Sequence, residues 1–492
     1  MAKLFVFAIG GTGSRVMKAL TLLLASGVEI KNTDTIIPII IDPDSANGDL
    51  TRTVELLRAY KEIRKKAWSE GTSFFKAEFQ SLDELGEGGF LSDNFKFDID
   101  GVKEQLFREF IAYNELTRSN RAFTSLLFSK DNLDADMDVG FKGNPNIGSV
   151  VLNKFKDSDF FRKFAANYEP QDRVFIISSI FGGTGAAGFP LILKNIRDAS
   201  HPVPHHAFLK DARIGAVTIL PYFSVRPNDE TSIKSESFIA KTRAALSYYS
   251  RNVSGNKSIN ALYYIGDVVT NEQEGADGAT KQKNRAHFVE LAAALAIVDF
   301  MALEDTELAV ANGEAVSPRF FEFGLEEETS NITFNTLAQE TYNLIAKPLT
   351  QYGLFKSFID NHFDEAASRK GEAYITDGNN KLSGLVPNHR LRICLRNFHQ
   401  HYNDWLNEMA GSVVSCRFID HNKSGKDIYN LVNGRPAQKN SIMGILKGTG
   451  VNHYGTVLSE KARSVDHLNS DQKLLALFSK VTEEIVSKQI AL

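Results

Sequence analysis

Two glycine clusters of the same form carry the clearest chemistry in the chain. "FAIGGTGSRV" covers residues 7–16 and "FGGTGAAGFP" covers residues 181–190, and each follows an apolar run of strand length. A helix that begins at such a turn offers free backbone N–H groups and a partial positive charge, which attract phosphate. Glycine lets the backbone approach phosphate oxygens and adopt a positive φ. A tight turn without a ligand explains one cluster equally well, but two of them favour a phosphate-binding site.

Neither cluster matches the two most familiar phosphate motifs. The first cluster does not match the dinucleotide fingerprint G-x-G-x-x-G, because Val16 occupies the position of the third glycine of that motif. Neither cluster ends in the Gly-Lys-Ser/Thr of a P-loop. An NAD(P)-dependent oxidoreductase therefore has only the general α/β pattern in its favour and is the weakest of the functional alternatives.

Two acidic residues follow the next apolar segment. Asp42 and Asp44 come directly after "TIIPIII" (35–41), at the expected carboxyl edge of a sheet, where ligands bind in open α/β folds. Carboxylates are hard oxygen ligands of the kind that Mg²⁺ takes. The alternative is an Asx turn that uses both side chains locally. The sequence favours Asp44 as a nucleotide or Mg²⁺ contact and Asp42 less so.

The elements around these residues predict an α/β fold with a parallel, Rossmann-like sheet and a mostly helical C-terminal part. Buried-strand patterns alternate with helical patterns over residues 1–283, which we expect to form a nucleotide-binding domain. Within it, residues 53–140 have helical patterns typical of an insertion or covering layer. Residues 284–301 predict a long helix that is apolar nearly all round and therefore buried. Residues 302–492 predict a mostly helical second domain.

The composition excludes several classes of protein. The 492 residues carry a net charge of −4 and no basic tract, so nucleic-acid binding has no support. The only two cysteines, Cys394 and Cys416, exclude a disulfide scaffold. No apolar stretch is long enough to span a membrane, and the first residues lack the pattern of a signal peptide. We therefore expect a cytoplasmic protein without direct membrane insertion.

Taken in order, these motifs resemble those of the tubulin and FtsZ superfamily, in a form most similar to divergent bacterial tubulin-like proteins. "IDPDSAN" (41–47) resembles the family's acidic loop, "GNPNIG" (143–148) its Gly-Ala-Asn-Pro loop, and "VTILPYF" (217–223) its strand beside the ribose. "AHFVELAAALAI" (286–297) is similar to its buried central helix. The resemblance implies GTP or GDP with Mg²⁺ as cofactors. It assigns nucleotide contacts to the following residues: Gly10, Gly11, Thr12, Gly13, Asp44, Gly143, Asn144, Pro145, Gly182, Gly183, Thr184, Gly185, Ala186, Arg226, Asn284 and His287.

Some positions depart from the family pattern around the nucleotide. Ala187 replaces the last glycine of the phosphate signature, so the backbone must avoid a positive φ there. Arg226 stands beside Val225, which occupies the place of a ribose-contacting Glu. His287 aligns with the Asn that reads guanine, and Asn284 is expected one helical turn earlier on a similar face. A buried, locally satisfied histidine explains His287 as well as base contact does.

The segment similar to the family's catalytic loop lacks its acids. In "SNITFNTL" (330–337) the candidate positions are Asn331, Thr333, Asn335 and Thr336, and the two threonines replace aspartates. A threonine hydroxyl does not act as a base at neutral pH, so hydrolysis is slow or other acids replace these positions. Those candidate acids are Asp299, Glu304 and Glu326–Glu328.

The resemblance implies head-to-tail self-association into filaments or rings. We predict a GTP-binding, self-assembling, cytoskeleton-like protein whose GTPase activity is open. The alternative is a non-hydrolysing, nucleotide-dependent scaffold that acts with operon-encoded partners, for example in defence.

Overall fold

The computed structural model describes most of the chain. The described residues are 2–44, 46–86, 92–99, 101–102, 105–137, 141, 144–225, 236–267, 271–273, 283–324, 329–369, 372–376, 381–435 and 450–492. They divide into two compact units, and the division differs from the predicted boundary near residue 283. The first unit contains residues 1–19, 31–54 and 79–327, and the second contains residues 20–30, 55–78 and 328–492. Each unit is therefore assembled from separate stretches of sequence.

The first unit is built on an eight-stranded sheet, which confirms the predicted α/β fold class. Its strands run in the order β12-β8-β6-β5-β1-β2-β3, and β4 pairs with β2. The pairs between β12, β8, β6, β5, β1 and β2 are all parallel, as is the pair of β2 with β4. The strand bounds are β1 Lys3–Ile9, β2 Thr35–Ile41, β3 Glu78–Phe79, β4 Lys96–Phe97, β5 Arg173–Ser179, β6 Arg213–Ile219, β8 Ala261–Ile265 and β12 Arg319–Phe323. The central strands β1 and β5 are almost completely buried, as expected from their continuous apolar sequences.

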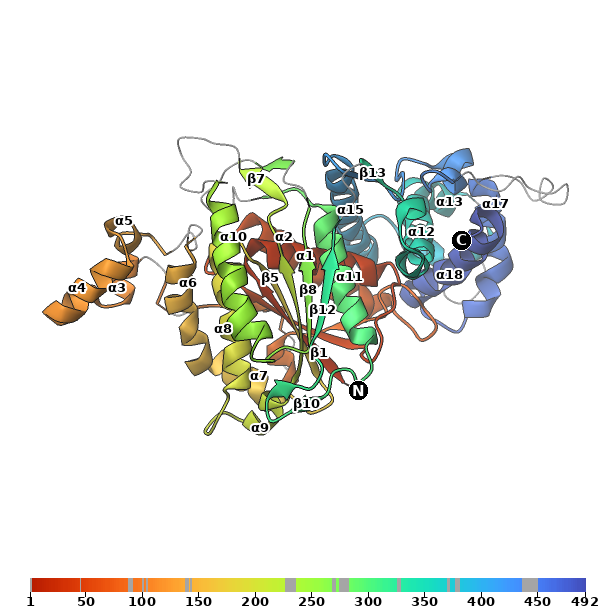
Figure 1. The fold of residues 1–492 in the computed structure, drawn as a ribbon. Helices are drawn as coiled ribbons and strands as arrows, with labels where there is room; N and C mark the ends of the chain where they lie inside the picture. Colours follow the sequence, from red (N-terminus) through yellow and green to blue (C-terminus); the bar gives the residue numbers. More distant parts are fainter. Residues whose placement is uncertain are drawn as a thin grey trace. The chain divides into compact units, whose positions relative to one another are not determined.

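Helices cover both faces of this sheet, as Figure 1 shows, with α8 and α10 on one side and α11 on the other. The main helices of the unit are α6 Pro145–Leu152, α7 Asp159–Asn167, α8 Gly183–Arg197, α10 Glu236–Tyr249 and α11 Phe288–Ala302. Helices α1 (Gly10–Ala25) and α2 (Gly48–Ala67) each begin in the first unit and continue into the second. In the described part of the chain, no helix combines the length and the apolar character needed to cross a membrane.

The order of the strands places a topological switch point between β1 and β5. From β1 the chain continues to its neighbour β2, whereas from β5 it builds outward on the other side through β6 and β8. In open α/β sheets the crevice for ligands forms at the carboxyl ends of the strands on either side of such a point. Both GGTG turns follow these two strands, so the fold brings the two glycine clusters to one place.

The central helix α11 begins later than predicted. The apolar pattern predicted a helix over 284–301, but α11 spans Phe288–Ala302, with His287 as its N-cap. The physical reason is the capping box of His287 and Glu290, which fixes the helix start. Asn284 therefore precedes the helix, and the expectation that it occupies the same helical face as His287 was wrong. The prediction that the helix is buried is confirmed, because most of its residues are inaccessible.

The second unit is mostly helical, as predicted. Its main helices are α12 Gln339–Asn361, α15 Arg390–Ala410, α17 Val451–Lys461 and α18 Ser470–Ile485. The shorter elements are α13 Phe363–Ser368, α14 Ala373–Thr376, β13 Asn331–Ile332 and β14 Ser415–Cys416. Its core is rich in aromatic rings, and the ring of Phe478 contacts those of both Phe355 and Phe358. Cys416 is buried, as is Cys394, and both are free thiols.

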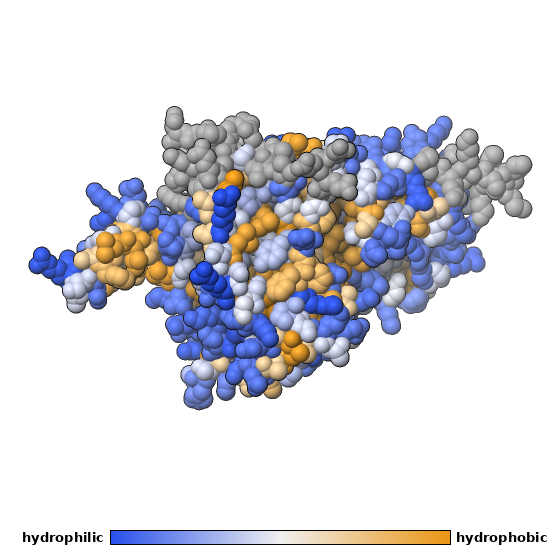
Figure 2. All heavy atoms as spheres, viewed as in Figure 1, coloured by the Kyte–Doolittle hydropathy of each residue, from blue (hydrophilic) through white to orange (hydrophobic). Residues whose placement is uncertain are grey.

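Residues 53–140 form less of a helical layer than predicted. They contain most of α2 and the short helices α3 Phe107–Phe110, α4 Arg118–Leu127 and α5 Lys130–Leu133. Helix α4 buries none of its residues, and Phe123, Leu126 and Leu127 are 62%, 84% and 55% exposed. Figure 2 shows the hydrophobic residues of this segment at the left of the molecule. The helix thus presents an apolar face to solvent.

Several glycines of the two clusters are required by packing rather than by a ligand. A Cβ atom on Gly13 would lie 2.6 Å from the carbonyl carbon of Ala8, and one on Gly185 would lie 2.7 Å from the carbonyl oxygen of Ser179. Each helix therefore starts in direct backbone contact with the strand that precedes it. Gly10 has a different role, since its φ of +72° is a conformation that favours glycine.

We expect Gly13→Ala to destabilise the first unit by about 1–3 kcal/mol, because the added methyl group meets backbone that cannot move aside. Gly324→Ala is the matched control, since a Cβ there meets nothing within 4 Å. Urea unfolding followed by circular dichroism measures both free energies of unfolding. Equal stability of the two variants would show that the backbone contact at position 13 is not a constraint.

Candidate functional site at the switch point

The two GGTG turns lie against each other at the carboxyl ends of β1 and β5. A Cβ atom placed on Gly10 would be 3.5 Å from the Cβ of Thr184 and 3.8 Å from the backbone nitrogen of Gly185. Helix α8 begins after Gly182, and no side chain caps its first turn. The free N–H groups of that turn and its partial positive charge suit an anion. Ala187 is helical and not at positive φ, as its position in the signature required.

The predicted contacts on the third loop are placed in part. Asn144 caps its own helix, α6, by accepting hydrogen bonds from the backbone nitrogens of Asn146 and Ile147. Pro145 is the first residue of that helix. Helix α6 packs so close to the second GGTG turn that a Cβ on Gly148 would lie 2.9 Å from the carbonyl oxygen of Gly183. Gly143 and Arg226, which were also predicted contacts, lie outside the described residues.

The acidic loop after β2 forms consecutive Asx turns. An Asp42 carboxylate oxygen accepts a hydrogen bond from the backbone nitrogen of Asp44, and Asp44 accepts one from Ala46. The local interpretation of these residues is thus confirmed, and the second oxygen of Asp42 lies 3.5 Å from the side-chain nitrogen of Asn47. Burial and the charge of Asp44 raise the pKa of Asp42 to about 8. A buried carboxyl group beside a second carboxyl group is suited to a divalent cation.

A buried ionic network that the sequence analysis missed lies beneath the first GGTG turn. Arg15, two residues after Gly13, donates hydrogen bonds to Glu290 (2.5 Å), Asp49 (2.6 Å), Tyr222 (2.8 Å) and Thr12 (3.2 Å). Its side chain is 4% exposed. Tyr222 also donates to the Oε1 atom of Glu290, at 2.7 Å. The network connects the starts of α1, α2 and α11 with the segment after β6.

The charges in this network are balanced. Arg52 donates to Asp49 at 2.7 Å and to the backbone oxygen of Asn284 at 2.6 Å, so two arginines face two carboxylates. Burial lowers the pKa of Arg15, but Tyr222, Glu290 and Asp49 more than offset this and raise it. Arg15 therefore stays charged at every pH at which the protein is folded. A signal existed in the sequence, because an arginine amid the apolar residues of a buried helix needs acidic partners.

His287 is held by the protein itself. Its Nδ1 atom accepts a hydrogen bond from the backbone nitrogen of Val289 at 3.2 Å, and its ring packs on Tyr222 and Phe288. The side chain is 2% exposed, and its Nε2 atom lies 3.7 Å from Asp267. Burial and the positive charge of Arg15 lower the pKa of His287 to about 4. The buried, locally satisfied state foreseen as an alternative is therefore present, and contact with a base stays a prediction.

The candidate catalytic positions all belong to the second unit. The Thr336 hydroxyl donates to the backbone oxygen of Thr333 and accepts from its backbone nitrogen, so this side chain closes a local turn. Asn331 belongs to β13, and the side chain of Asn335 donates weakly to Gly434 at 3.5 Å. Of the candidate acids, Asp299 accepts from the Tyr263 hydroxyl, and Glu304 is exposed. Residues 326–328 lie outside the described residues.

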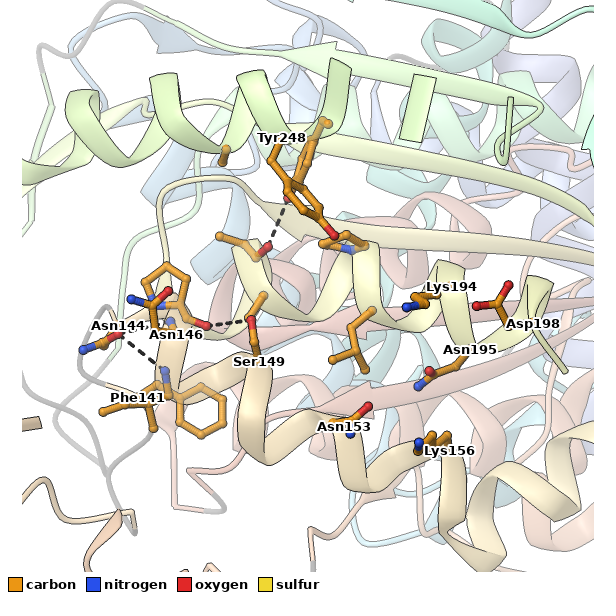
Figure 3. Close-up of a pocket in the computed structure, with 18 of the residues that line it drawn as sticks. Phe141, Asn144, Asn146, Ser149, Asn153, Lys156, Lys194, Asn195, Asp198 and Tyr248 are labelled. Carbon is orange, nitrogen blue, oxygen red and sulfur yellow. Dashed lines mark hydrogen bonds between the residues drawn. The ribbon is translucent and has the colours of Figure 1, made fainter. Parts of the chain in front are cut away.

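A groove of about 1320 Å³ runs beside this site, between α6, α8 and α10. It shares Asn144, Pro145 and Ala186 with the predicted contacts but is not lined by the GGTG glycines. Figure 3 shows Asn153 and Lys156 facing Lys194 and Asn195 along it. In the part of the chain that is described, no three His, Cys, Asp or Glu side chains are grouped to hold a metal by themselves.

These observations define a doubly wound parallel α/β protein whose two GGTG turns meet at the switch point of the sheet. No protein-family model and no curated protein matches the chain. Solved structures do match. They include an FtsZ dimer from M. jannaschii (14% identity, TM-score 0.28, covering 61% of this chain and 53% of that one). They also include CetZ from Methanosaeta thermophila (12%, 0.27, 61% and 52%) and a GTPγS-bound protofilament of CetZ2 from Haloferax volcanii (12%, 0.30, 62% and 61%).

This chain spans only about half to three-fifths of the length of these solved structures.

We expect His287→Asn to reduce the loss of stability in acid. Since the folded-state pKa of His287 is lowered from 6.5 to about 4, the unfolded chain binds more protons between these values, and stability falls as the pH falls through this window. Asparagine keeps an oxygen for the helix cap but does not titrate. The difference in unfolding free energy between pH 7 and pH 4 should shrink by up to about 3 kcal/mol. Denaturant unfolding at the two pH values measures it, and identical pH profiles would contradict the neutral, buried histidine.

Proposed function

We propose that the chain binds a guanine nucleotide at the switch point and assembles with further copies of itself. The observation that carries the proposal is the contact between the two GGTG turns, at the ends of the strands that flank the switch point. A dinucleotide fold of the Rossmann type uses one glycine turn, whereas this crevice has two helix starts, α1 and α8, beside one another. The two starts suit a chain of phosphates. We propose guanine as the base because the sequence motifs resemble those of the tubulin and FtsZ superfamily.

Magnesium fits the acidic side of the same crevice. Asp42 and Asp44 would hold the cation directly or through water, and the other oxygens would come from phosphate and water. The raised pKa of Asp42 supports this assignment, because a bound cation would offset the burial and the charge of Asp44 that raise it. When bound, Mg²⁺ supplies charge neutralisation of the phosphates. In the absence of the cation, the two Asx turns keep both carboxylates in place.

The self-association we propose is head-to-tail, so that a filament or ring results. One chain then contributes the crevice, and another contributes its second unit. Thr333 and Thr336 offer no base, which favours slow hydrolysis or a purely nucleotide-dependent scaffold with protein partners. The scaffold is the second candidate, and the fixed position of the Thr336 hydroxyl in a local turn supports it.

We expect GDP with Mg²⁺ to raise the melting temperature of the protein, because a ligand that binds only the folded state stabilises it, by about 2.7 kcal/mol at a hundredfold excess over Kd. ADP at the same concentration should have little effect. Differential scanning calorimetry measures both, and mass spectrometry identifies the copurified nucleotide. Recovery of only adenine nucleotides or NAD(P) would overturn the guanine assignment.

We expect Thr333→Asp to raise the rate of GTP hydrolysis per molecule at least tenfold at protein concentrations that permit assembly. The substitution restores an acid that can position water, and aspartate still caps the short helix that follows. Thr333→Asn, of the same shape without charge, is the control. Phosphate release is measured across a range of protein concentrations. Equal rates for the two variants would remove this segment from the catalytic role.

A further inference from the structure

Among the described residues, Thr12 is one of several buried helical hydroxyl groups without an acceptor, together with Ser14 and Thr242, and of these three it is the one that an arginine contacts. It is 7% exposed, and its oxygen accepts a hydrogen bond from the Nη2 atom of Arg15 at 3.2 Å. In the described part of the chain, the hydroxyl proton of Thr12 has no acceptor. By contrast, Ser26 and Thr53 donate to the backbone oxygen four residues earlier, the usual place for a helical hydroxyl. A nearly buried donor without an acceptor is unfavourable for the folded state.

We propose that Arg15 is a positioning residue that orients the Thr12 hydroxyl as a donor to a phosphate oxygen of the bound nucleotide. An arginine only donates, so the oxygen that it contacts must present its lone pair to Arg15 and turn its proton elsewhere. Thr12 lies in the first turn of α1, and the free N–H groups of such a turn suit an anion. A phosphate oxygen there satisfies both the amides and the hydroxyl. The inference rests on the proposed nucleotide site and assigns one donor within it.

Three further contacts hold Arg15 in this orientation. Glu290 binds its Nε atom, Asp49 its Nη1 atom and Tyr222 its Nη2 atom. Because these partners lie on α11, α2 and the segment after β6, the direction of the Thr12 proton depends on four elements at once. The second GGTG turn has no equivalent, since Ala187 occupies the position of Arg15 there. The two turns are therefore alike in sequence but not in how their hydroxyl groups are held.

A double-mutant cycle on the full chain tests the proposal, with GDP as the probe and isothermal calorimetry as the measurement. We expect Thr12→Val to weaken GDP binding about tenfold or more, to leave guanosine binding unchanged, and to be rescued by Thr12→Ser. Arg15→Lys keeps the charge beside Asp49 and Glu290 but cannot contact all partners, so it should also weaken GDP binding. In the Thr12→Val background, Arg15→Lys should add less than twofold, because the group that it orients is gone.

The matched control is Thr184→Val, for which the effect of Arg15→Lys should be fully retained. If the effects of Thr12→Val and Arg15→Lys multiply, the positioning role is overturned while the nucleotide site stands. If the unmodified protein binds no guanine nucleotide, the proposed function is overturned, and this inference falls with it. Should Arg15→Lys fail to fold, Arg15→Gln, which keeps hydrogen-bond donors, replaces it in the same cycle. Thermal unfolding without nucleotide separates a loss of stability from a loss of binding.

Discussion

The close contact between the first turn of each helix and the end of its preceding strand is the constraint on which the site depends. At Gly13 and Gly185 the distance leaves no room for a side chain. Helix α1 follows β1 directly and only residues 180–182 separate β5 from α8, so both helices begin close to the carboxyl edge of the sheet. A longer connection would still permit the fold, but it would move the two helix starts away from the switch point. The glycines thus make the site indirectly, through the backbone geometry that they allow.

The buried network of Arg15 is the second requirement. Placing an arginine in this position without partners would carry a large desolvation penalty, and the partners come from three other elements. The network therefore forms only when α1, α2, α11 and the segment after β6 are all in place. Removing one carboxylate would leave an unbalanced buried charge. This destabilises the folded state more than replacing the whole ion pair by apolar residues would. The buried network under the first turn is therefore complete only in the correctly folded first unit.

Much of the fold could be predicted from the sequence, and the reasons are local. The strand β1 and the helix after it follow from an apolar run, a glycine turn and helical periodicity. The start of α11 could not be predicted from its apolar residues, since the cap of His287 and Glu290 decides it. The edge strand β12 was not predicted either. It is five residues long and largely exposed, so it lacks the apolar run that marks the central strands.

The same distinction between local sequence patterns and contacts made by folding explains which parts of the candidate site could be predicted. Types of residue with a characteristic spacing, such as the two GGTG turns, can be found in one sequence, and the parallel sheet then brings them together. Contacts between residues far apart in the chain cannot be found in this way, and Arg15 with Glu290 spans 275 positions. The residues assigned to nucleotide binding all belong to the first unit, whereas the segment assigned to hydrolysis belongs to the second. Threonine at positions 333 and 336 therefore bears on the proposed hydrolysis but leaves the residues proposed for nucleotide binding unchanged, so the two proposed activities can be lost separately.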